Sequence, residues 1–490
     1  MNPEQRLDKK SESIILRAKS PVMRIKDGSV APMTIHLAMT TESDEMMVQF
    51  STGASNVLNN AMVPVVMYGT SAKNMSVISR EGNTTTYKAT DLCQAPANLE
   101  EPGKFTSPHL LHNVKMKGLV ADTRYYYKVG LMDWDSSENL DSKNSHSNDV
   151  KWSEVYSFRS PIPAGMKPEN SAEHVDTEEP FVFIVYADQG ITGYGGTGND
   201  DGKRVSKFTE REIQKNGARA VHHFGDLSYA QGASHIWDAW LDMVSVFATQ
   251  VPLMIGVGNH EYDHTLGGGG GKDPSGLMSD GGYNPEWGNF LEDSQGECGV
   301  PVSKRFVMPA NGNGVYWYSF DHGFVHTIMI SSEHDLSPKS LQYQWLERDL
   351  LAIDRTKTPW VIVESHRPMY MIEDVPSNTL VGIHMRKDFE SLLYQHNVDL
   401  YLAGHYHAYF RTCAGLYKGK CHNGGVTHIT VGTAGAELDS TPLLRKNWAE
   451  FFSAEWGYGR ITVFDKTSLL WEFISDQDGE VKDSTWLRKE

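Results

Sequence analysis

The sequence has few cysteines, no long apolar run and no excess of positive charge. Only 4 of its 490 residues are cysteines, and none of them forms the CxxC pair of a zinc or redox site. It contains no run of about 18 apolar residues, so we expect no membrane-spanning segment. Acidic residues outnumber basic ones by 62 to 45, a net charge of −17, which argues against binding to a nucleic-acid polymer.

The signals for a cellular compartment conflict. An even number of cysteines permits two disulfides, a short loop closed by Cys413 and Cys421 and a pair of Cys93 with Cys298, although reduced, buried thiols explain the same count. Two glycosylation sequons, at Asn74 and Asn83, fit a secreted protein, either extracellular or vacuolar. The N-terminal stretch MNPEQRLDKK is polar, however, and lacks the apolar core of a signal peptide. The compartment therefore stays open on these residues.

At this length the chain is expected to form two domains. Residues 1–29 read as a polar tail, and residues 30–160 contain short β-branched or aromatic runs such as EMMVQF and RYYYKVGL. Their partial alternation predicts a fibronectin- or immunoglobulin-like β-sandwich. Residues 161–180, rich in Pro, Glu and Ser, read as a linker. Residues 181–485 alternate apolar strands with amphipathic helices, which is typical of an α/β domain.

Within that second domain, two local expectations follow. The stretch beginning SPKSLQYQWLERDLL is predicted to be a helix with Ser337 as its cap and Pro338 in its first turn. Residues 262–332, which contain a run of five glycines, are expected to be a long loop inserted at one edge.

Polar side chains follow five apolar runs of the second domain at the point where each run ends. The five runs are FVFIVYA, ARAVHHF, VPLMIGV, PWVIVES and VDLYLA, and the residues that follow them include Asp188, Asp226, Tyr229, Asn259, His260, His366, His405 and His407. Ligand sites of α/β sheets lie at the carboxyl ends of strands. Five such positions in register therefore predict one metal-binding site, although any one of them alone would indicate only a structural polar group.

Two other motifs are interpreted as accidental. His260 and His264 have the HExxH spacing of a zinc protease, but the motif follows a strand and a Gly-Asn turn and runs into glycines, so we expect no helix that would bring both histidines together. The GxGxxG match at residues 193–198 is followed by Asn-Asp-Asp-Gly instead of a helix, which argues against dinucleotide binding.

The chain resembles the metallophosphoesterases, because the motifs DxG, GDxxY, GNH, a lone His and GHxH follow one another in that order. Tyr229 and the pair His405 and His407 narrow the resemblance to the purple acid phosphatases. The stretches GDLSYA, GNHEYD, TKTPWVIVESHRPMY and AGHYHAYFRTC are similar to the large plant-type members, which carry a fibronectin-like N-terminal domain. The resemblance covers about residues 30–480. It implies a catalytic β-sandwich flanked by helices (αββα), preceded by an all-β domain.

The resemblance also implies the metal ligands. Asp188, Tyr229 and His407 would hold one ion, Asn259, His366 and His405 the other, and Asp226 would bridge the two. The chemistry of the residues agrees, because phenolate and carboxylates suit ferric iron, whereas amide and imidazoles suit a divalent ion such as zinc, iron or manganese. A metal-bound hydroxide would attack the phosphorus of a phosphomonoester.

Substrate contacts are expected from Asn259 and from His260, which would also protonate the leaving group. Asp226, as the bridge between the metal ions, is the second residue expected to be catalytic. The histidines that follow the HxP motif in better-known plant enzymes are missing here. Glu373 and Asp374 stand in that stretch, and His384, the only late histidine in it, is a further candidate for substrate contact. We therefore expect diesters or anhydrides to be favoured relative to monoester dianions.

The leading interpretation is a secreted metal-dependent acid phosphatase acting on small phosphorylated substrates. A nucleotide pyrophosphatase or phosphodiesterase using the same site is the first alternative. A non-catalytic binding protein, acting through its β-domain, is the second. A homodimer is one assembly that the sequence allows, and the sequence does not decide between it and a monomer.

Overall fold

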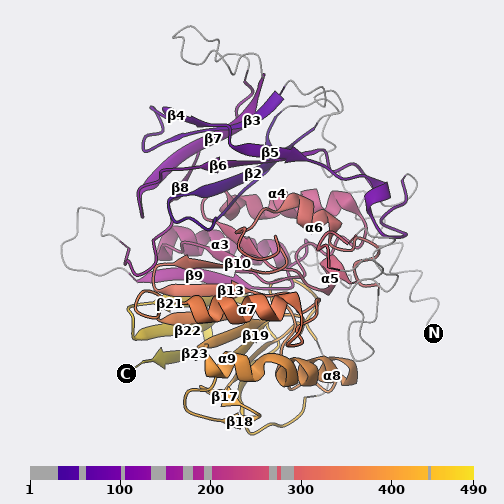
Figure 1. Cartoon of the computed structure of the whole chain (residues 1–490), viewed down its shortest axis with the longest axis vertical. Helices are drawn as coiled ribbons and strands as arrows, with labels where there is room; N and C mark the ends of the chain where they lie inside the picture. Colours follow the sequence, from indigo (N-terminus) through magenta and orange to yellow (C-terminus); the bar gives the residue numbers. More distant parts are fainter. Residues whose placement is uncertain are drawn as a thin grey trace.

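The computed structural model describes residues 31–53, 62–100, 105–133, 150–168, 180–191, 201–263, 273–277, 292–439 and 443–489. Figure 1 shows an N-terminal β-domain at one end of the molecule and a larger layered domain below it. The expected tail (1–29) lies outside the described residues, as do the GxGxxG match and part of the expected linker.

The N-terminal domain is a sandwich of two four-stranded antiparallel sheets. Its strands are β1 (Met33–Ala38), β2 (Met46–Thr52), β3 (Met62–Gly69), β4 (Val77–Ser79), β5 (Gly82–Thr85), β6 (Leu110–Met116), β7 (Arg124–Asp133) and β8 (Tyr156–Arg159), and a short 3-10 turn, η1 (Ala89–Asp91), precedes β6. The sheets have the orders β1-β2-β6-β5 and β4-β3-β7-β8. One core, including Val48 and Val114 of the first sheet and Val66 and Tyr127 of the second, fills the space between them. The expected β-sandwich is confirmed.

The second domain is built on two mixed sheets. The first, of order β11-β10-β9-β21-β22-β23, contains β9 (Phe181–Tyr186), β10 (Val221–His223), β11 (Leu253–Ile255), β21 (Gly457–Val463), β22 (Ser468–Ser475) and β23 (Val481–Arg488). The second, of order β12-β13-β14-β15-β19-β16-β20, contains β12 (Tyr318–His322), β13 (Val325–Met329), β14 (Trp360–Glu364), β15 (Leu400–Ala403), β16 (Tyr409–Thr412), β19 (Thr427–Val431) and β20 (Ala449–Ser453). The strands β9 to β11 are parallel, as are β13, β14, β15 and β19.

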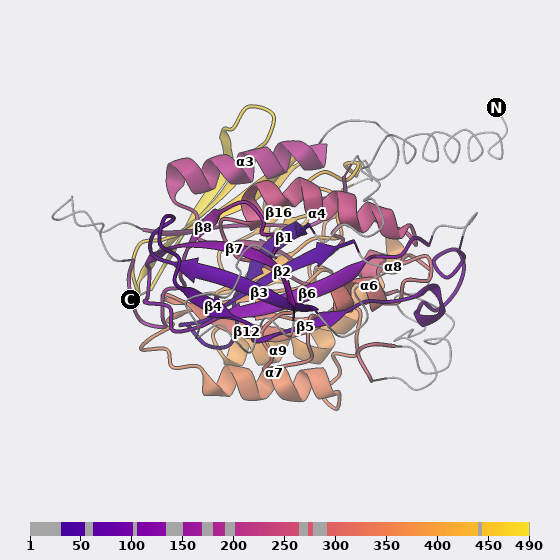
Figure 2. The same ribbon diagram turned by 90° about the horizontal axis from the view of Figure 1, so that it is seen from above.

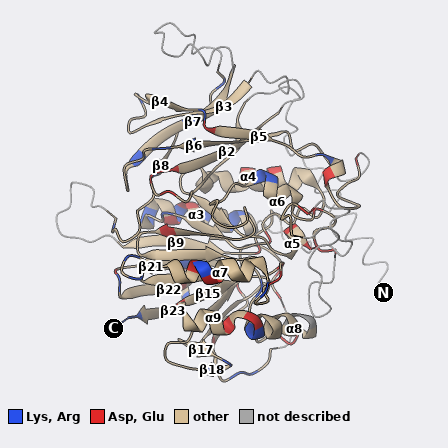
Figure 3. Cartoon of the chain, viewed as in Figure 1, with Lys and Arg blue, Asp and Glu red and all other residues tan. Residues whose placement is uncertain are grey.

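Helices cover the outer faces of the two sheets. In Figures 1 and 2, α3 (Asp201–Asn216) and α4 (Ser234–Ala248) lie on one side, and α7 (Leu341–Ala352), α8 (Pro376–Met385) and α9 (Ser391–Gln395) lie on the other. The α4 helix buries Trp237, Trp240, Leu241, Val244 and Phe247 along the stripe that its sequence predicts. The layers therefore run helix, sheet, sheet, helix, and the αββα architecture is confirmed. Basic and acidic segments alternate on α3 and α7 (Figure 3).

The N-terminal domain packs on the α4 side of the larger domain. The hydroxyl of Tyr127 donates to the carbonyl of Thr249 at 2.9 Å, and the backbone N–H of Val307 donates to the side chain of Gln49 at 2.6 Å. A disulfide joins Cys93 to Cys298, and a second one joins Cys413 to Cys421 across the hairpin of β17 (Leu416–Tyr417) and β18 (Lys420–Cys421). The alternative of reduced cysteines is thus wrong for this structure.

Two local expectations need correction. The region 262–332 is not one inserted loop, because β12 and β13 pair there and extend the second sheet, and α6 (Val300–Arg305) precedes them. The cap of α7 is Ser340 rather than Ser337, since the Ser340 hydroxyl accepts from the backbone N–H of Tyr343 at 3.0 Å. Ser337 instead donates its hydroxyl to Asp335.

None of the described helices has the length and apolar character needed to cross a membrane.

Candidate metal centre

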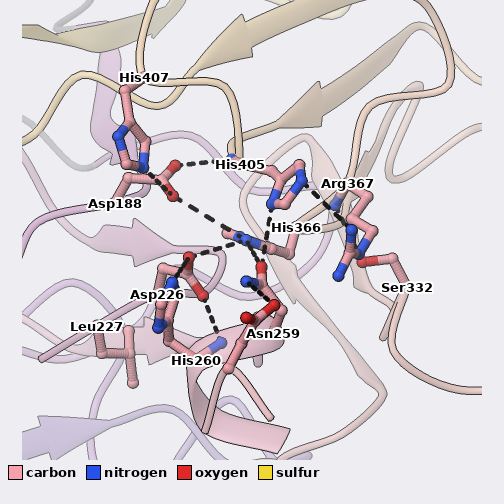
Figure 4. A network of polar contacts seen from close by, with 12 residues as sticks. Asp188, Asp226, Leu227, Asn259, His260, Ser332, His366, Arg367, His405 and His407 are labelled. Atoms are coloured by element: carbon pink, nitrogen blue, oxygen red, sulfur yellow. Dashed lines mark hydrogen bonds and ion pairs between the residues drawn. The ribbon is translucent and has the colours of Figure 1, made fainter. Parts of the chain in front are cut away.

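The carboxyl ends of five strands from both sheets converge on one buried site. Asp188 follows β9 and Asp226 follows β10, whereas Asn259 begins the short helix α5 (Asn259–Tyr262) after β11. His366 follows β14, and the GHYH turn follows β15. Three of these strands thus belong to the first sheet and two to the second. The site therefore lies at the carboxyl ends of strands from both sheets, and Figure 4 shows its side chains drawn together.

One group of side chains consists of Asp188, Tyr229 and His407. The hydroxyl of Tyr229 donates to Oδ1 of Asp188 at 3.1 Å and lies 2.9 Å from Nε2 of His407. The same imidazole nitrogen is 3.5 Å from Oδ1 of Asp188. Three atoms from three distant segments therefore face one small volume, with the phenol and the carboxylate that were expected together.

The second group consists of Asn259, His366 and His405. The side-chain oxygen of Asn259 accepts from Nε2 of His366 at 2.9 Å and from Nδ1 of His405 at 3.0 Å. This group is therefore made of an amide and two imidazoles and carries no carboxylate of its own.

Asp226 connects the two groups. Its Oδ2 atom lies 3.2 Å from Nε2 of His366, and that nitrogen is 4.0 Å from Oδ1 of Asp188 (Figure 4). One donor atom each of Asp226, His366 and His405 lies within 4.8 Å of the other two. All seven residues predicted as metal ligands are thus brought together, with Asp226 in the position expected for a bridge.

The backbone at the site adopts conformations that depend on the surrounding structure. Asp188, Asp226, Tyr229 and His405 all have positive φ, at 62°, 52°, 50° and 68°. Non-glycine residues rarely adopt this region, and clusters of such residues are typical of functional sites. Close packing also requires glycine, because a Cβ atom on Gly404 would lie 2.4 Å from the Asp188 carboxylate.

The charge balance at the site favours a bound cation. Asp188 and Asp226 are 0% and 1% exposed, and buried carboxylates require compensating positive charge. Burial lowers the pKa of His366, but the carboxylates of Asp226 and Asp188 outweigh it and raise that pKa to about 9. The pKa of His407 also rises to about 9, because burial lowers it less than the carboxylate of Asp188 raises it. Burial and the charge of Arg367 hold the pKa of His405 well below its usual range, which leaves a neutral imidazole.

The donor types at the site fit a pair of metal ions. Carboxylate, phenol, amide and imidazole are all known metal ligands, and ligand histidines must give up their protons to bind. Once His366 and His407 have lost their protons, the site carries an excess of negative charge, which bound cations would balance.

Glu261 is a functional residue that the sequence reading missed. Its carboxylate accepts from the backbone N–H groups of Asp226 at 2.7 Å, Leu227 at 2.9 Å and Gly258 at 3.0 Å. It therefore holds the two turns that present Asp226 and Asn259. The α5 helix ends at Tyr262, so the HExxH stretch does not continue as a helix, although His264 itself lies outside the described residues. The glutamate of that motif positions backbone rather than acting as a protease base.

Arg367 is a second residue of the site that the sequence did not single out. It is buried directly after His366, and its guanidinium donates to Glu333 at 2.9 Å and to Asp263 at 3.0 Å. A further nitrogen of this guanidinium lies 3.3 Å from Nε2 of His405 (Figure 4). Arg367 thus supports the outer side of an imidazole whose other nitrogen faces the site. Adjacency to His366 is the only signal in the sequence, because its carboxylate partners lie far away along the chain.

Two of the residues predicted to contact substrate, Asn259 and His260, lie at the site, whereas the third, His384, lies on α8. His260 is buried at the site, with Nε2 3.9 Å from Oδ2 of Asp226 and its ring 4.6 Å from that of Tyr229. Asn259 also donates its amide to Asp293 at 3.1 Å. His384 lies on α8, where its charge acts on Asp388 in the following turn, and its role in substrate contact stays a prediction.

Comparison with known proteins identifies the family. Family models match residues 32–160 (purple acid phosphatase, N-terminal domain), 202–409 (calcineurin-like phosphoesterase) and 425–484 (iron/zinc purple acid phosphatase-like protein C).

Curated relatives and solved structures agree with these models. The chain is 29% identical to "Probable inactive purple acid phosphatase 1" of Arabidopsis thaliana, over 94% of this chain and 70% of that protein. It is 28% identical to a nucleotide pyrophosphatase/phosphodiesterase of Hordeum vulgare, over 70% of this chain and 89% of the relative. The structure of a purple acid phosphatase from yellow lupin (Lupinus luteus) seeds superimposes with a TM-score of 0.78 at 26% identity, covering 94% of this chain and 75% of the other. The chain belongs to the purple acid phosphatase family of calcineurin-like metallophosphoesterases.

Proposed function

We propose that this protein hydrolyses phosphomonoesters at a dinuclear metal centre. The observation that carries the proposal is the convergence of seven donor side chains, from five strand ends in two sheets, on one buried site. The match of residues 425–484 to the iron/zinc purple acid phosphatase-like model supports it.

Asp188, Tyr229 and His407 would hold one metal ion, Asn259, His366 and His405 the second, and Asp226 both. When bound, the two ions would neutralise the charge of the phosphate and make a water molecule acidic enough to serve as the nucleophile. The first set suits ferric iron because it offers a phenolate and carboxylates, and the second suits zinc, manganese or ferrous iron.

His260 is our candidate for the proton donor to the leaving oxygen. The carboxylate of Asp226 accepts its backbone N–H at 3.0 Å, which fixes the start of α5, and packing against Tyr229 fixes the plane of its ring. An imidazole in this place is able to protonate a leaving alcohol without large motion. Asn259, the preceding residue, would contact the phosphate.

A nucleotide pyrophosphatase or phosphodiesterase activity is the second candidate, and the likeness to the nucleotide pyrophosphatase/phosphodiesterase of Hordeum vulgare supports it. Glu373 is buried, and burial together with the charge of Asp439 raises its pKa to about 8, while His407 acts in the opposite direction. At mildly acidic pH the Glu373 side chain is therefore neutral and repels a phosphate dianion little, whereas above about pH 8 its charge would favour a diester or an anhydride over a dianion. Equal rates on a matched monoester and diester above that pH would argue against this preference.

Phosphorus NMR of ATP incubated with the metal-loaded protein at mildly acidic pH separates the candidates. Orthophosphate and ADP as first products support the phosphatase, whereas pyrophosphate and AMP move the assignment to the pyrophosphatase. An Asp226→Asn variant, which keeps the shape of the side chain, serves as the control and should leave ATP intact. If wild type cleaves neither ATP nor a simple phosphomonoester, the proposal fails and a non-catalytic role, as the name of the Arabidopsis relative suggests for that protein, takes its place.

We also propose that the protein is secreted or vacuolar and glycosylated. The support is the pairing of all four cysteines, because disulfides persist in oxidising compartments, and the exposure of Asn74 and Asn83. A lower apparent mass after glycosidase treatment of the natural protein tests this proposal. Size-exclusion chromatography with light scattering tests the homodimer.

A further inference from the structure

A pocket with a volume of about 400 Å³ lies next to α8. Its walls come from α8 and the π-helical segment η4 (Arg386–Glu390), from the turn between β17 and β18, and from the segment around Trp448. These elements lie together at the end of the molecule opposite the N-terminal domain (Figure 1). The Cys413–Cys421 disulfide closes the loop that carries the turn.

The pocket is basic in a protein that is acidic overall. Arg386, Lys418 and Lys446 line it, and within the described parts of the chain none of the three forms an ion pair with a carboxylate. The carboxylate in the wall, Glu390, is already engaged, because it accepts from the hydroxyl of Tyr370 and from the backbone N–H of Lys418. The cations are therefore available to a bound anion.

Local geometry holds Arg386 and the aromatic wall in place. The guanidinium of Arg386 donates to the carbonyl of Met369 and lies 4.8 Å from the ring centre of Tyr370. The rings of Tyr370 and Trp448 meet edge to face at 5.3 Å. Arg386 begins a π-helical segment, and such interruptions of a helix occur frequently at functional sites.

The pocket shares a wall with the metal centre. Met371 lines the pocket, and its sulfur accepts from the hydroxyl of Tyr406, the residue between His405 and His407. Leu444 lines it as well, and its backbone N–H donates to the carbonyl of Ile372. The pocket therefore adjoins the turn that presents two of the predicted ligands.

We propose that this pocket is a second phosphate subsite, which binds the far phosphate of a substrate whose near phosphate lies at the metal centre. The substrate class is then small molecules with at least two separate phosphate groups. Arg386 supplies a planar fork from a fixed position, and the exposed Lys418 and Lys446 supply mobile positive charge. With a net charge of −17, the protein repels polyanions except where cations gather locally. The inference rests on the proposed function of the metal centre.

The test uses the full-length, metal-loaded protein with a Lys418→Ala/Lys446→Ala double variant. Lys420→Ala is the matched control, because Lys420 is exposed on the same hairpin but does not line the pocket. Glucose 6-phosphate and fructose 1,6-bisphosphate provide a hexose with one phosphate or two. We expect the double variant to raise KM for the bisphosphate about tenfold, with kcat and the KM for the monophosphate unchanged. Lys420→Ala should behave as wild type.

Calorimetric titration with fructose 1,6-bisphosphate measures binding at the pocket even if the protein does not hydrolyse this sugar. If wild type binds the bisphosphate about tenfold more tightly than the double variant but hydrolyses nothing, the pocket stands while the proposed activity fails. Equal behaviour of the double variant and Lys420→Ala overturns the inference, as does an equal rise of KM for both sugars. Lysine-dependent binding of inorganic phosphate, with no change in KM for the bisphosphate, also overturns it and identifies free phosphate as the occupant.

Discussion

The carboxylate of Glu261 accepts the backbone N–H of Asp226 at 2.7 Å, across two turns that follow neighbouring strands. Its oxygens also accept from Leu227 and Gly258, so one buried side chain fixes the backbone on which Asp226 and Asn259 stand. A residue that belongs to an apparent protease motif thus organises a metal centre of another kind.

Replacement of Glu261 by glutamine should weaken metal binding about 10- to 100-fold, because an amide offers one accepting oxygen where the carboxylate offers two. Zinc titration by calorimetry measures the change. Glu450→Gln on β20, an exposed position, is the control and should bind metal as wild type does. Unchanged affinity in Glu261→Gln would show that the turns hold their shape without this carboxylate.

The Tyr229→Phe variant should lose visible colour after loading with ferric iron. The hydroxyl that contacts Asp188 and His407 is the only group removed, and the ring contact with His260 can persist. A phenolate bound to ferric iron absorbs visible light, whereas the remaining ligands would not replace that band. Absorption spectra of the two proteins at matched iron content test this. A band of equal intensity in Tyr229→Phe would refute the assignment of Tyr229 as a ligand.

Metal binding should release protons at neutral pH. In the metal-free protein the carboxylates outweigh burial and raise the pKa values of His366 and His407 to about 9, so both imidazoles are charged at about pH 7 and must lose their protons to bind. His405, whose pKa is lowered by burial and Arg367, should release none. Tyr229 adds a third proton, because burial and the charge of Asp188 raise the pKa of its phenol well above the usual value and it must ionise to bind ferric iron. Calorimetry in buffers of different ionisation enthalpy should therefore give about three protons at about pH 7 and about one, from Tyr229, at about pH 10. No release at neutral pH would contradict the expectation.

His326 should make the stability of the domain depend on pH, away from the metal centre. Its ring nitrogens lie 2.6 Å from Asp321 and 2.9 Å from Asp349, and although burial acts in the opposite direction, these carboxylates raise its pKa from 6.5 to about 9. A raised pKa favours the folded state most below the unfolded value, so the contribution is complete below about pH 6.5 and is lost as pH rises through about 9. Its upper limit is about 3 kcal/mol.

Urea unfolding of wild type and His326→Gln at about pH 6 and about pH 10 measures this contribution. The variant should be less stable at the lower pH, and the difference should shrink at the higher one. A stability difference that is the same at both values would show that His326 contributes through packing alone.

The strand ends explain why the candidate site could be predicted so fully. Asp188 and His366 follow a short apolar run directly, and Asp226 and Asn259 follow one after a single glycine; such runs are visible in a sequence. Glycines next to Asn259 and His405 mark the same turns. The strands β12 and β13 escaped although their segment, VYWYSFDHGFVHTIMI, is rich in aromatic and aliphatic residues, because the whole region was assigned to one loop on the strength of the glycine run that precedes it.

Local patterns of side chains suffice to predict the all-β domain and the α/β domain, and together with the family resemblance they predict the seven candidate donor residues. The packing of sheets and helices sets which of these donors face each other, how the strands divide between two sheets, and which cations line the second pocket. Arg367 meets carboxylates that lie 34 and 104 residues away, and Lys418 and Arg386 reach the same pocket from different elements. Contacts between such distant residues arise only when sheets and helices pack, and no local pattern records them.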